Sequence, residues 1–385
     1  MDDKNTTPFF AFSVNDRNNT PVFTESKADW IPYGEDNLYP EYLIDLMNTS
    51  SKHNSLIRKK VNMSVGSGFK ENPTTSEFIK NPNGKDDLNT IAFKNGYDLN
   101  TYGGYAIAVT WNNERTKIVR ESFVDFSKVR VAKVLEDGSP MAELQAQGVE
   151  FYYISSDWSQ YRKDKYKPQL IQGFSETHKE AATQLMYVTE YRAGVDYYTY
   201  PDYIASVDWI ELDKEIANFH LSSVKNGFTP SMIISMKGGI PTEEEQKKFK
   251  KKLKQQYSGS DNASQVFVTF SEGADASPEF VPINLNASDD RFLQLEDQIQ
   301  QNIIIAHGAS PIVAGVAISG KLGSSDEVRE SEQMFQNNVI DAKQKLIERS
   351  YNKILEVNGS NEKVELLGIK SFDEETEIIV EDGNE

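Results

Sequence analysis

The sequence predicts an α+β fold made of two or three packed units, and three observations support this prediction. The chain has 385 residues, whereas a single hydrophobic core stops growing at about 250 to 300 residues. Apolar residues follow a helical period before residue 100 and alternate with a period of two between 105 and 192. From Asp202 to Glu356 the pattern is again mainly helical, with short strand-like runs between the helices.

Composition and charge narrow the class of protein. Hydrophobic residues make up 38% of the chain and aromatic residues 11%, which is enough for ordinary globular cores. The 59 acidic and 41 basic side chains leave a formal net charge of −18. Because a protein that binds nucleic acid by counterion release needs a basic surface, this charge argues against a general grip on DNA. It is compatible with DNA that passes along an acidic wall.

Three features that the sequence lacks narrow the class of protein further. The chain has no cysteine, which excludes disulfides, thiolate metal sites and a thiol nucleophile, and fits a protein made in a reducing cytoplasm. The N-terminus has neither a basic nor an apolar segment, so no signal peptide is expected. No run of about 18 apolar residues predicts a membrane span.

The N-terminal part is predicted to begin with an extended arm and to continue with helices. Residues 1–40 are polar and contain four prolines, which is typical of an arm rather than a packed element. Gly66 is a suitable C-terminal cap for the second helix, and Leu88, Ile91 and Phe93 are expected to be the buried side of the third. The predicted helices are 41–48, 51–65 and 86–99.

A sheet-rich unit is predicted between residues 100 and 200. β-branched and aromatic residues alternate with polar ones in five runs, and Asp137-Gly138 marks a turn between two of them. The predicted strands are 105–111, 117–120, 129–134, 149–154 and 184–192.

The second half is predicted to be mostly helical. Thr242 with Glu245, and Ser324 with Glu327, supply helix-start signals. The glycine- and serine-rich segment 308–325 is expected to be a loop, and the acidic segment after Glu362 to contain one short strand. The predicted helices are 202–226, 242–257, 289–306 and 326–356, and the predicted strands are 231–236 and 265–270.

One segment has the spacing of a phosphate-binding loop up to its last position. In Gly315 to Leu322 the position that needs a Ser or Thr hydroxyl for Mg²⁺ is Leu322. Such a loop also follows a strand, whereas the segment before this one is predicted to be helical. The preferred interpretation is a loop between two helices, and a nucleotide-binding enzyme that uses Lys321 stays as the alternative.

No metal, cofactor or catalytic residue is expected. The histidines show no ligand-like spacing that repeats, and no Ser/His/Asp arrangement has supporting context. Each histidine is therefore interpreted as an ordinary surface or core residue. They are His53, His178, His220 and His307.

A cluster of lysines stands out in this acidic chain. It lies in the predicted helix 242–257, whose acidic start and basic end match the helix dipole. Two interpretations stay open: a solvated helix face, or a contact with DNA or with a second copy of the chain. The lysines are Lys247, Lys248, Lys250, Lys251, Lys252 and Lys254.

Short phrases mark the ends of the predicted helices and strands after Asp202, and they are 226–230 (NGFTP), 257–263 (YSGSDNA), 290–296 (DRFLQLE) and 307–311 (HGASP). The order of these phrases and elements resembles that of tailed-bacteriophage portal proteins of the HK97 type. The phrase 98–105 (DLNTYGGY) resembles an N-terminal portal phrase. Two features depart from the family: its glycine-valine-proline phrase reads Gly308-Ala309-Ser310-Pro311 here, and the chain after Glu356 is short.

The resemblance implies a portal-like architecture with an α/β wing, two stem helices, a small α/β clip and a long wing helix. The implied divisions are an N-terminal arm (1–40), the N-terminal part of the wing (41–201), a stem helix (202–226), the clip (227–286), a second stem helix (287–307), a tunnel loop (308–325), the wing helix (326–357) and an acidic C-terminal tail (358–385). The tunnel-loop residues implied to line a DNA channel are Gly308, Gly315, Ser319, Gly320, Lys321, Leu322 and Gly323. The clip lysines would contact partners.

The resemblance also implies a function. The chain would be a non-enzymatic subunit of a homo-oligomeric ring, a dodecamer, at the capsid vertex of a virion assembled in the bacterial cytoplasm. Double-stranded DNA would pass through the channel without sequence recognition. The implied partners are the terminase large subunit, the major capsid protein or scaffold, and a head-tail adaptor, with no membrane. The alternatives are the nucleotide-binding enzyme and another virion ring or capsid component.

Overall fold

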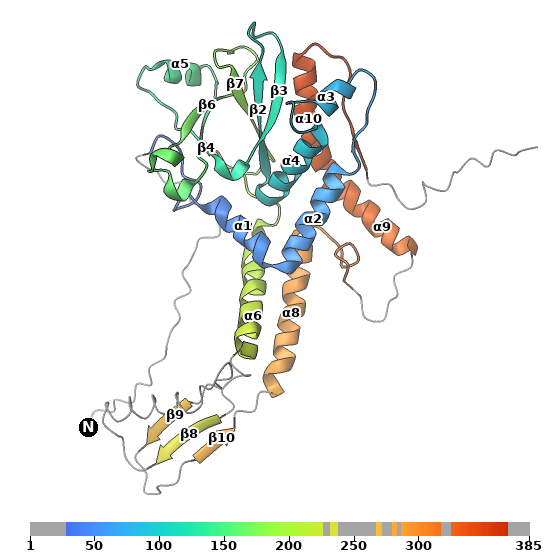
Figure 1. Ribbon diagram of the computed structural model, residues 1–385. Coiled ribbons are helices and arrows are strands. Elements are labelled where there is room, and N and C mark those ends of the chain that lie inside the picture. Colours follow the sequence, from blue (N-terminus) through green and yellow to red (C-terminus); the bar gives the residue numbers. More distant parts are fainter. Residues whose placement is uncertain are drawn as a thin grey trace, which may run out of the picture. The chain divides into compact units, whose positions relative to one another are not determined.

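A computed structural model describes residues 28–225, 232–237, 267–271, 279–282, 286–316 and 325–368. The chain divides into two compact units, each discontinuous in sequence: unit 1 combines 1–43, 65–204 and 345–385, and unit 2 combines 44–64 and 205–344. Helices and strands occur in both units (Figure 1), which confirms the predicted α+β class.

Unit 1 is built around a six-stranded sheet with the order β3-β2-β7-β6-β5-β4 (Figure 1). Neighbouring strands are antiparallel except β6 and β7, which are parallel. The strands are β2 (Gly104–Trp111), β3 (Ile118–Val124), β4 (Val129–Val131), β5 (Phe151–Ile154), β6 (Gln169–Gly173) and β7 (Thr183–Thr189).

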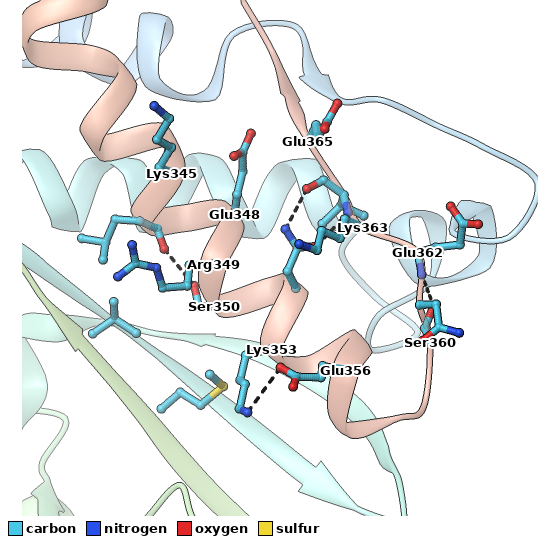
Figure 2. Close-up of a pocket in the computed structure, with 16 residues that line it drawn as sticks. Lys345, Glu348, Arg349, Ser350, Lys353, Glu356, Ser360, Glu362, Lys363 and Glu365 are labelled. Carbon is cyan, nitrogen blue, oxygen red and sulfur yellow. Dashed lines mark hydrogen bonds and ion pairs between the residues drawn. The ribbon is translucent and has the colours of Figure 1, made fainter.

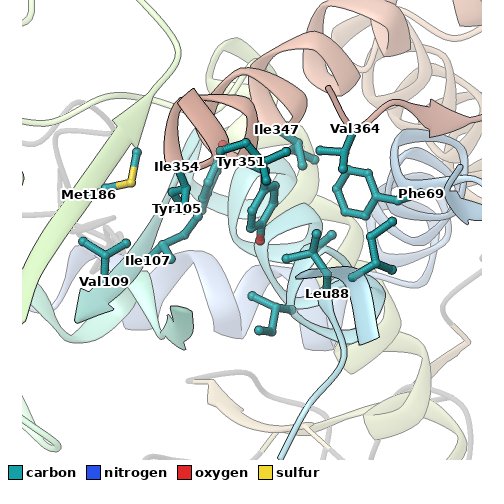
Figure 3. Close-up of a cluster of buried hydrophobic side chains, with 14 of the residues drawn as sticks. Phe69, Leu88, Tyr105, Ile107, Val109, Met186, Ile347, Tyr351, Ile354 and Val364 are labelled. Atoms are coloured by element: carbon teal, nitrogen blue, oxygen red, sulfur yellow. The ribbon is translucent and has the colours of Figure 1, made fainter. Parts of the chain in front are cut away.

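Two helices, α4 (Leu88–Tyr102) and α10 (Asp341–Val357), pack with one face of this sheet in the main core of unit 1 (Figure 3). Apolar side chains from β2 and β7 meet those of both helices, and Phe69 and Val364 from two further segments join them. The labelled residues of this core are Phe69, Leu88, Tyr105, Ile107, Val109, Met186, Ile347, Tyr351, Ile354 and Val364. The polar atoms of buried tyrosines are satisfied there: Tyr105 Oη donates to the Leu346 carbonyl oxygen (3.1 Å), and Asn95 Nδ2 donates to Tyr351 Oη (2.7 Å).

Local signals set the ends of α4. The Asp87 carboxylate accepts a hydrogen bond from the Thr90 backbone N–H (2.7 Å), and hydrogen bonds from the Thr90 side chain and backbone lower the pKa of Asp87. At the other end Gly103 has φ +83°, and a Cβ there would lie 2.6 Å from the Tyr200 carbonyl oxygen. Only glycine fits this left-handed and crowded position.

The guanidinium of Arg130 is fully buried and fixes the N-terminal segment of unit 1. It donates to Asn37 Oδ1 (2.7 Å), to the Asn37 carbonyl oxygen (2.7 Å), and to the carbonyl oxygens of Ser127 (2.6 Å) and Val129 (2.8 Å). It also lies 4.8 Å from the Trp158 ring centroid. Burial lowers the pKa of Arg130, but these contacts hold the charge in place.

This packing corrects the prediction of an extended arm over 1–40 for its last third. Trp30 and Tyr33 are buried, and the Tyr33 ring stacks on Tyr198 with centroids 4.0 Å apart. The aromatic side chains, which the proline content masked in the sequence, make residues 28–40 part of a core. Residues 1–27 lie outside the described part of the chain.

Glu121 is a buried carboxyl in the same core as the apolar residues of β2. It lies on β3 opposite Val109, its side chain is 2% exposed, and burial raises the pKa of Glu121 to about 8. At neutral pH the folded protein therefore holds this carboxyl in its protonated form.

Both edges of the six-stranded sheet make contacts with other segments of unit 1. At β3, the Asn358 side chain bonds the N–H and C=O of Ile118 (2.7 and 2.9 Å), and the Glu121 N–H donates to the Pro82 carbonyl oxygen (3.0 Å). At β4, Trp30 forms a bridge with Ala132. The Ile31 N–H donates to the Val131 carbonyl oxygen, and the Asp29 carbonyl oxygen accepts from the Lys133 N–H.

Short elements complete unit 1. Gly66, the predicted cap of the second helix, has φ +59°, and a Cβ there would lie 1.8 Å from the Leu367 carbonyl oxygen, so the predicted cap is confirmed. The remaining elements are β1 (Gly68–Phe69), which pairs with β11 (Leu366–Leu367), α3 (Ser76–Lys80), α5 (Pro140–Ala146), and the 3-10 turns η1 (Phe126–Lys128), η2 (Trp158–Gln160), η3 (Asp164–Tyr166) and η4 (Ile204–Ser206).

Unit 2 is mainly helical and contains a three-stranded sheet with the order β10-β8-β9. β8 and β9 are parallel, and parallel neighbours need a long crossover. The predicted helix 242–257 falls in that connection, outside the described residues. The elements are α1 (Tyr39–Thr49) and α10, each shared with unit 1, α2 (Ser51–Val65), α6 (Val207–Lys225), β8 (Met232–Lys237), β9 (Phe267–Ser271), β10 (Glu279–Pro282), α8 (Asn286–Ala306) and α9 (Ser325–Phe335). No described helix is long and apolar enough to cross a bilayer.

The predicted single helix 326–356 is interrupted by a π-helical turn, η5 (Gln336–Ile340). Phe335 and Ile340 are five residues apart, yet both are buried in one cluster with Met63 and Val313. An α-helix turns 100° per residue and would place these two side chains on different sides. The wider π turn brings both into the cluster.

Other expectations were wrong in detail. Phe93 was expected to be buried with Leu88 and Ile91, but it is 41% exposed. The strands β6 and β10 and the helices α3 and α5 were not predicted.

Candidate functional site

The helices α6 and α8 run antiparallel beside each other in unit 2 (Figure 1). The Ser206 hydroxyl, at the start of α6, donates to the Asn302 carbonyl oxygen near the end of α8 (3.0 Å). Farther along, His220 Nε2 lies 3.5 Å from Glu296 Oε1. The pair is the part of the structure that corresponds to the predicted stem helices 202–226 and 287–307.

Polar contacts attach α6 to the corner between α1 and α2. Asp213, which is 9% exposed, accepts a hydrogen bond from the Ser50 hydroxyl (2.7 Å) and forms an ion pair with Lys52. One residue on, Lys214 pairs with Asp45 (2.6 Å). Because hydrogen bonds to a largely buried carboxylate are among the stronger ones, these contacts fix the N-terminal half of α6.

Two histidines join α2 to the end of α8. His53 Nδ1 lies 2.9 Å from His307 Nε2, and both rings are buried. At this distance one nitrogen donates its proton and the other accepts it, so the two facing nitrogens cannot both carry protons. The sequence reading treated all histidines singly and missed this pair, since the two residues are 254 positions apart.

The pair does not extend to a metal site in the described structure. Among the described residues, no group of three or more His, Cys, Asp or Glu side chains is placed to hold an ion. Of the other histidines, His178 lies 3.8 Å from Glu180, and His220 contacts α8 as described above.

The first half of the predicted tunnel loop 308–325 is a compact turn. Gly308 has φ +66° and ends α8, because the N–H groups of Gly308 and Ala309 donate to the carbonyl oxygens of Ile305 and Ile304. Residues 310–315 form a further turn that ends at Gly315, with φ +74°. Val313 at its centre is 1% exposed and belongs to the cluster around Met63 and Phe335.

The other predicted site residues lie outside the described part of the chain, and their roles stay predictions. In the tunnel loop these are Ser319, Gly320, Lys321, Leu322 and Gly323. In the clip they are Lys247, Lys248, Lys250, Lys251, Lys252 and Lys254. The residues just before the phosphate-loop-like segment follow a helix and not a strand, as the sequence predicted.

Large apolar side chains are exposed along the helices of unit 2. Their exposure in a single chain marks a surface that other protein can cover. They are Phe219 (46%) and Leu221 (52%) on α6, Leu293 (61%) and Ile305 (71%) on α8, and Val328 (38%) and Met334 (64%) on α9. The narrow apolar stripe of the first stem helix, which includes Phe219, indicated contact with neighbouring copies. The sequence could not show which side chains of the stripe are exposed, because an apolar pattern does not distinguish a core from an interface.

The same helices carry a surplus of negative charge. The α6 segment contains four carboxylates and two lysines, and α8 contains four carboxylates and one arginine. Such a surface disfavours lasting contact with phosphate groups. The helix pair thus combines apolar side chains suited to protein contact with a charge unsuited to a tight grip on nucleic acid.

Comparisons with known proteins give the family and the fold. A family model described as phage portal protein matches residues 62–378. No curated protein matches the chain.

Three solved structures are similar over most of the chain. One comes from the virion of a native gene transfer agent particle, with 11% identity, a TM-score of 0.52, and coverage of 85% of this chain and 83% of that one. Another comes from the neck of an empty particle of this kind computed with C6 symmetry, with 12% identity, a TM-score of 0.53, and coverage of 86% and 85%. A third comes from the neck of a native particle computed with C12 symmetry, with 12% identity, a TM-score of 0.52, and coverage of 85% and 83%.

Proposed function

Because this chain belongs to the phage portal protein family, we propose that it is a structural subunit of a closed homo-oligomeric ring through which double-stranded DNA passes. The family match covers residues 62–378 and confirms the resemblance found in the sequence. The ring would stand at a capsid vertex of a virion, without an enzymatic role of its own. The C12 symmetry of one similar neck structure supports a ring of twelve copies.

The observation that carries the proposal is the exposed apolar surface of α6, α8 and α9. Leu293 and Ile305 lie on α8 and are more than half exposed, which is unfavourable for a chain that stays single in water. Contact with the next copy would remove this surface from water. Where the same heterologous contact is repeated and the rotation closes, the product is a ring with a central hole.

The acidic character of α6 and α8 supports the DNA channel. DNA held by a basic wall would release counterions and bind tightly, which would resist sliding. A wall with surplus carboxylates repels the phosphate backbone at short range. DNA could then move through the ring in either direction, for packaging and for ejection.

The remaining parts of the proposal concern partners. The clip, residues 227–286, would dock the terminase large subunit during packaging and a head-tail adaptor afterwards. Its lysines would supply charged contacts in that region or to a neighbouring copy. The tunnel loop, residues 308–325, would lie at the narrowest part of the channel, and the wing would contact the major capsid protein or scaffold.

The test is assembly of the purified chain. Native mass spectrometry and negative-stain class averages are expected to show a closed ring with a central hole. Leu293→Asp combined with Ile305→Asp is expected to leave smaller species, since a carboxylate at each position would be buried at the contact. The matched control is Gln294→Asp with Gln301→Asp, which adds the same two charges at exposed positions of α8 and is expected to assemble.

Three results would contradict the proposal. A wild-type chain that stays monomeric at high concentration and across salt conditions would refute the ring. Rings formed equally well by the double variant would refute the role of the α8 surface. Class averages of a shell rather than a ring would favour another capsid component.

A further inference from the structure

A cleft of about 890 Å³ lies along the outer side of α10 in unit 1 (Figure 2). Its apolar lining comes from Met186 and Val188 on β7 and from Leu346 on α10. The segment 360–365 forms its opposite rim. The cleft shares no residue with the exposed surface of α6, α8 and α9 on which the ring proposal rests.

The chain that follows α10 runs back along this helix. Val364 exchanges two hydrogen bonds with the Asn352 side chain (2.7 and 3.0 Å), and the Leu366 N–H donates to Glu348 Oε1 (2.7 Å). A step of two residues along the segment after α10, from Val364 to Leu366, thus covers the four residues of α10 from Asn352 back to Glu348, which is about one helical turn. On this spacing the last described residue, Gly368, lies near the level of Lys345, at the start of the cleft.

Cations line the β7 side of α10. Lys345, Arg349 and Lys353 are spaced four residues apart and therefore lie on one face of the helix. In Figure 2 Lys345 and Arg349 are on one side of α10, and Lys363 and Glu365 are on the other. Lys353 pairs with Glu176 (2.7 Å).

Lys345 and Arg349 differ from Lys353 in their partners. Both are exposed, and neither makes an ion pair with any residue that the structure describes. In a chain with a net charge of −18, two neighbouring cations without an ion pair beside an apolar cleft are unusual. Four carboxylates also line the cleft, and none of them forms an ion pair with Lys345 or Arg349. Glu348 accepts the Leu366 N–H, Glu356 pairs with Lys353 (3.3 Å), and Glu362 and Glu365 belong to the far rim.

The end of the chain has the composition that fits this cleft. Residues 369–385 contain seven carboxylates and a single lysine, and the apolar run Ile378, Ile379 and Val380 stands between the acidic groups. Acidic residues before and after an apolar run match a cleft that has apolar side chains from β7 and, beside them, two cations of α10 without an ion pair.

We propose that the acidic C-terminal segment 371–385 binds in the cleft of its own chain, with its carboxylates at Lys345 and Arg349 and Ile378 to Val380 over Met186 and Val188. The reach is sufficient. Seventeen residues span up to roughly 55 Å when extended, whereas the helix from Lys345 to Lys353 is about 12 Å long and its diameter is about 10 to 12 Å. The segment can therefore cross α10 and follow its cationic face.

Amide hydrogen exchange on the full-length protein tests the proposal. Peptides from 371–385 are expected to exchange at least about tenfold more slowly than an unstructured chain. Lys345→Glu with Arg349→Glu is expected to return them to the unstructured rate, and about 0.5 M salt is expected to weaken the protection because it screens the ion pairs. Unchanged exchange in β2 and α4 shows that the fold of each variant is intact.

The matched control reverses two charges elsewhere in unit 1. Lys117→Glu with Arg120→Glu changes exposed cations at β3 and is expected to leave the protection of 371–385 as in the wild type. Unstructured exchange in the wild-type segment would overturn the proposal. So would protection that survives the reversal at Lys345 and Arg349.

A second measurement identifies the chain that supplies the segment. The protein has no cysteine, so Val188→Cys with Ile379→Cys introduces the only thiols. A short bis-maleimide is expected to link them within one chain, which keeps the monomer mass on a denaturing gel. Links that produce dimers would show that a second copy occupies the cleft and would overturn the assignment to the same chain. An absence of any link would overturn the docked position itself.

Discussion

Replacement of Glu121 by Gln should stabilise the protein in a pH-dependent way. The carboxyl is 2% exposed in the core of unit 1, and burial raises the pKa of Glu121 to about 8 from 4.5. Gln has nearly the same shape, keeps the polar group neutral at every pH, and so removes the cost of ionising a buried acid.

The magnitude follows from the difference in pKa between the folded and unfolded chain. Between about pH 4.5 and pH 8 the folded protein binds one more proton at Glu121 than the unfolded chain does, so the free energy of unfolding falls as pH rises. This loss in the free energy of unfolding is absent below about pH 4.5 and complete above about pH 8. At 1.36 kcal/mol per unit of pH, it reaches at most roughly 5 kcal/mol.

Urea unfolding at pH 5, 6.5 and 8 measures this, with tryptophan fluorescence as the signal and a fixed protein concentration. Wild type and Glu121→Gln should nearly agree at pH 5 and diverge by several kcal/mol at pH 8, with the variant more stable. Glu114→Gln is the control, because Glu114 is exposed in the turn between β2 and β3. An equal difference at pH 5 and pH 8 would mean that Glu121 is ionised in the folded protein, and the reasoning would fail.

Three further predictions concern packing. Arg130→Met should lower the free energy of unfolding by about 3 to 5 kcal/mol in the same urea assay, since it leaves buried carbonyl oxygens without donors. A loss below about 1 kcal/mol would show that the segment around Tyr33 packs in place without the guanidinium. Val313→Ala should cost about 2 kcal/mol by thermal unfolding, whereas a loose loop would lose nothing. Gly315→Ala should lower the free energy of unfolding by about 1 kcal/mol through its positive φ alone. Gly308→Ala should lower it further, because the added Cβ would lie 3.0 Å from Val339 Cγ2. An equal loss in the two variants would contradict the packing at Gly308.

Local signals in the sequence predicted much of the fold. The bounds of α2 were predicted at both ends, because a glycine with positive φ follows it. The strand β2 was found within one residue, since its alternation reflects one face in a core. The second strong signal was the series of phrases after Asp202, which led to the family that the family model confirms.

Features set by distant contacts were not predictable. The contact between His53 and His307 joins residues that no local pattern connects. The π turn exists because Phe335 and Ile340 share one cluster with Val313, and this depends on tertiary packing rather than on helix propensity. The strand β6 has little alternation, and it forms by pairing with β5 on one side and β7 on the other. The cleft along α10 forms only when the returning segment lies beside the helix.

Both edges of the six-stranded sheet are covered by other segments of the same chain, and this affects assembly. With Asn358 and Pro82 at β3 and Trp30 at β4, backbone groups at both margins already have partners within the chain. A neighbouring copy would then find few free backbone N–H and C=O groups with which to extend this sheet. Open-ended assembly by strand pairing between copies is therefore disfavoured. At this sheet, copies would meet through side chains, whose contacts form and break more readily than a shared sheet. A misplaced subunit could therefore leave before the circle closes, and the copy number would be selected by the geometry of the completed ring.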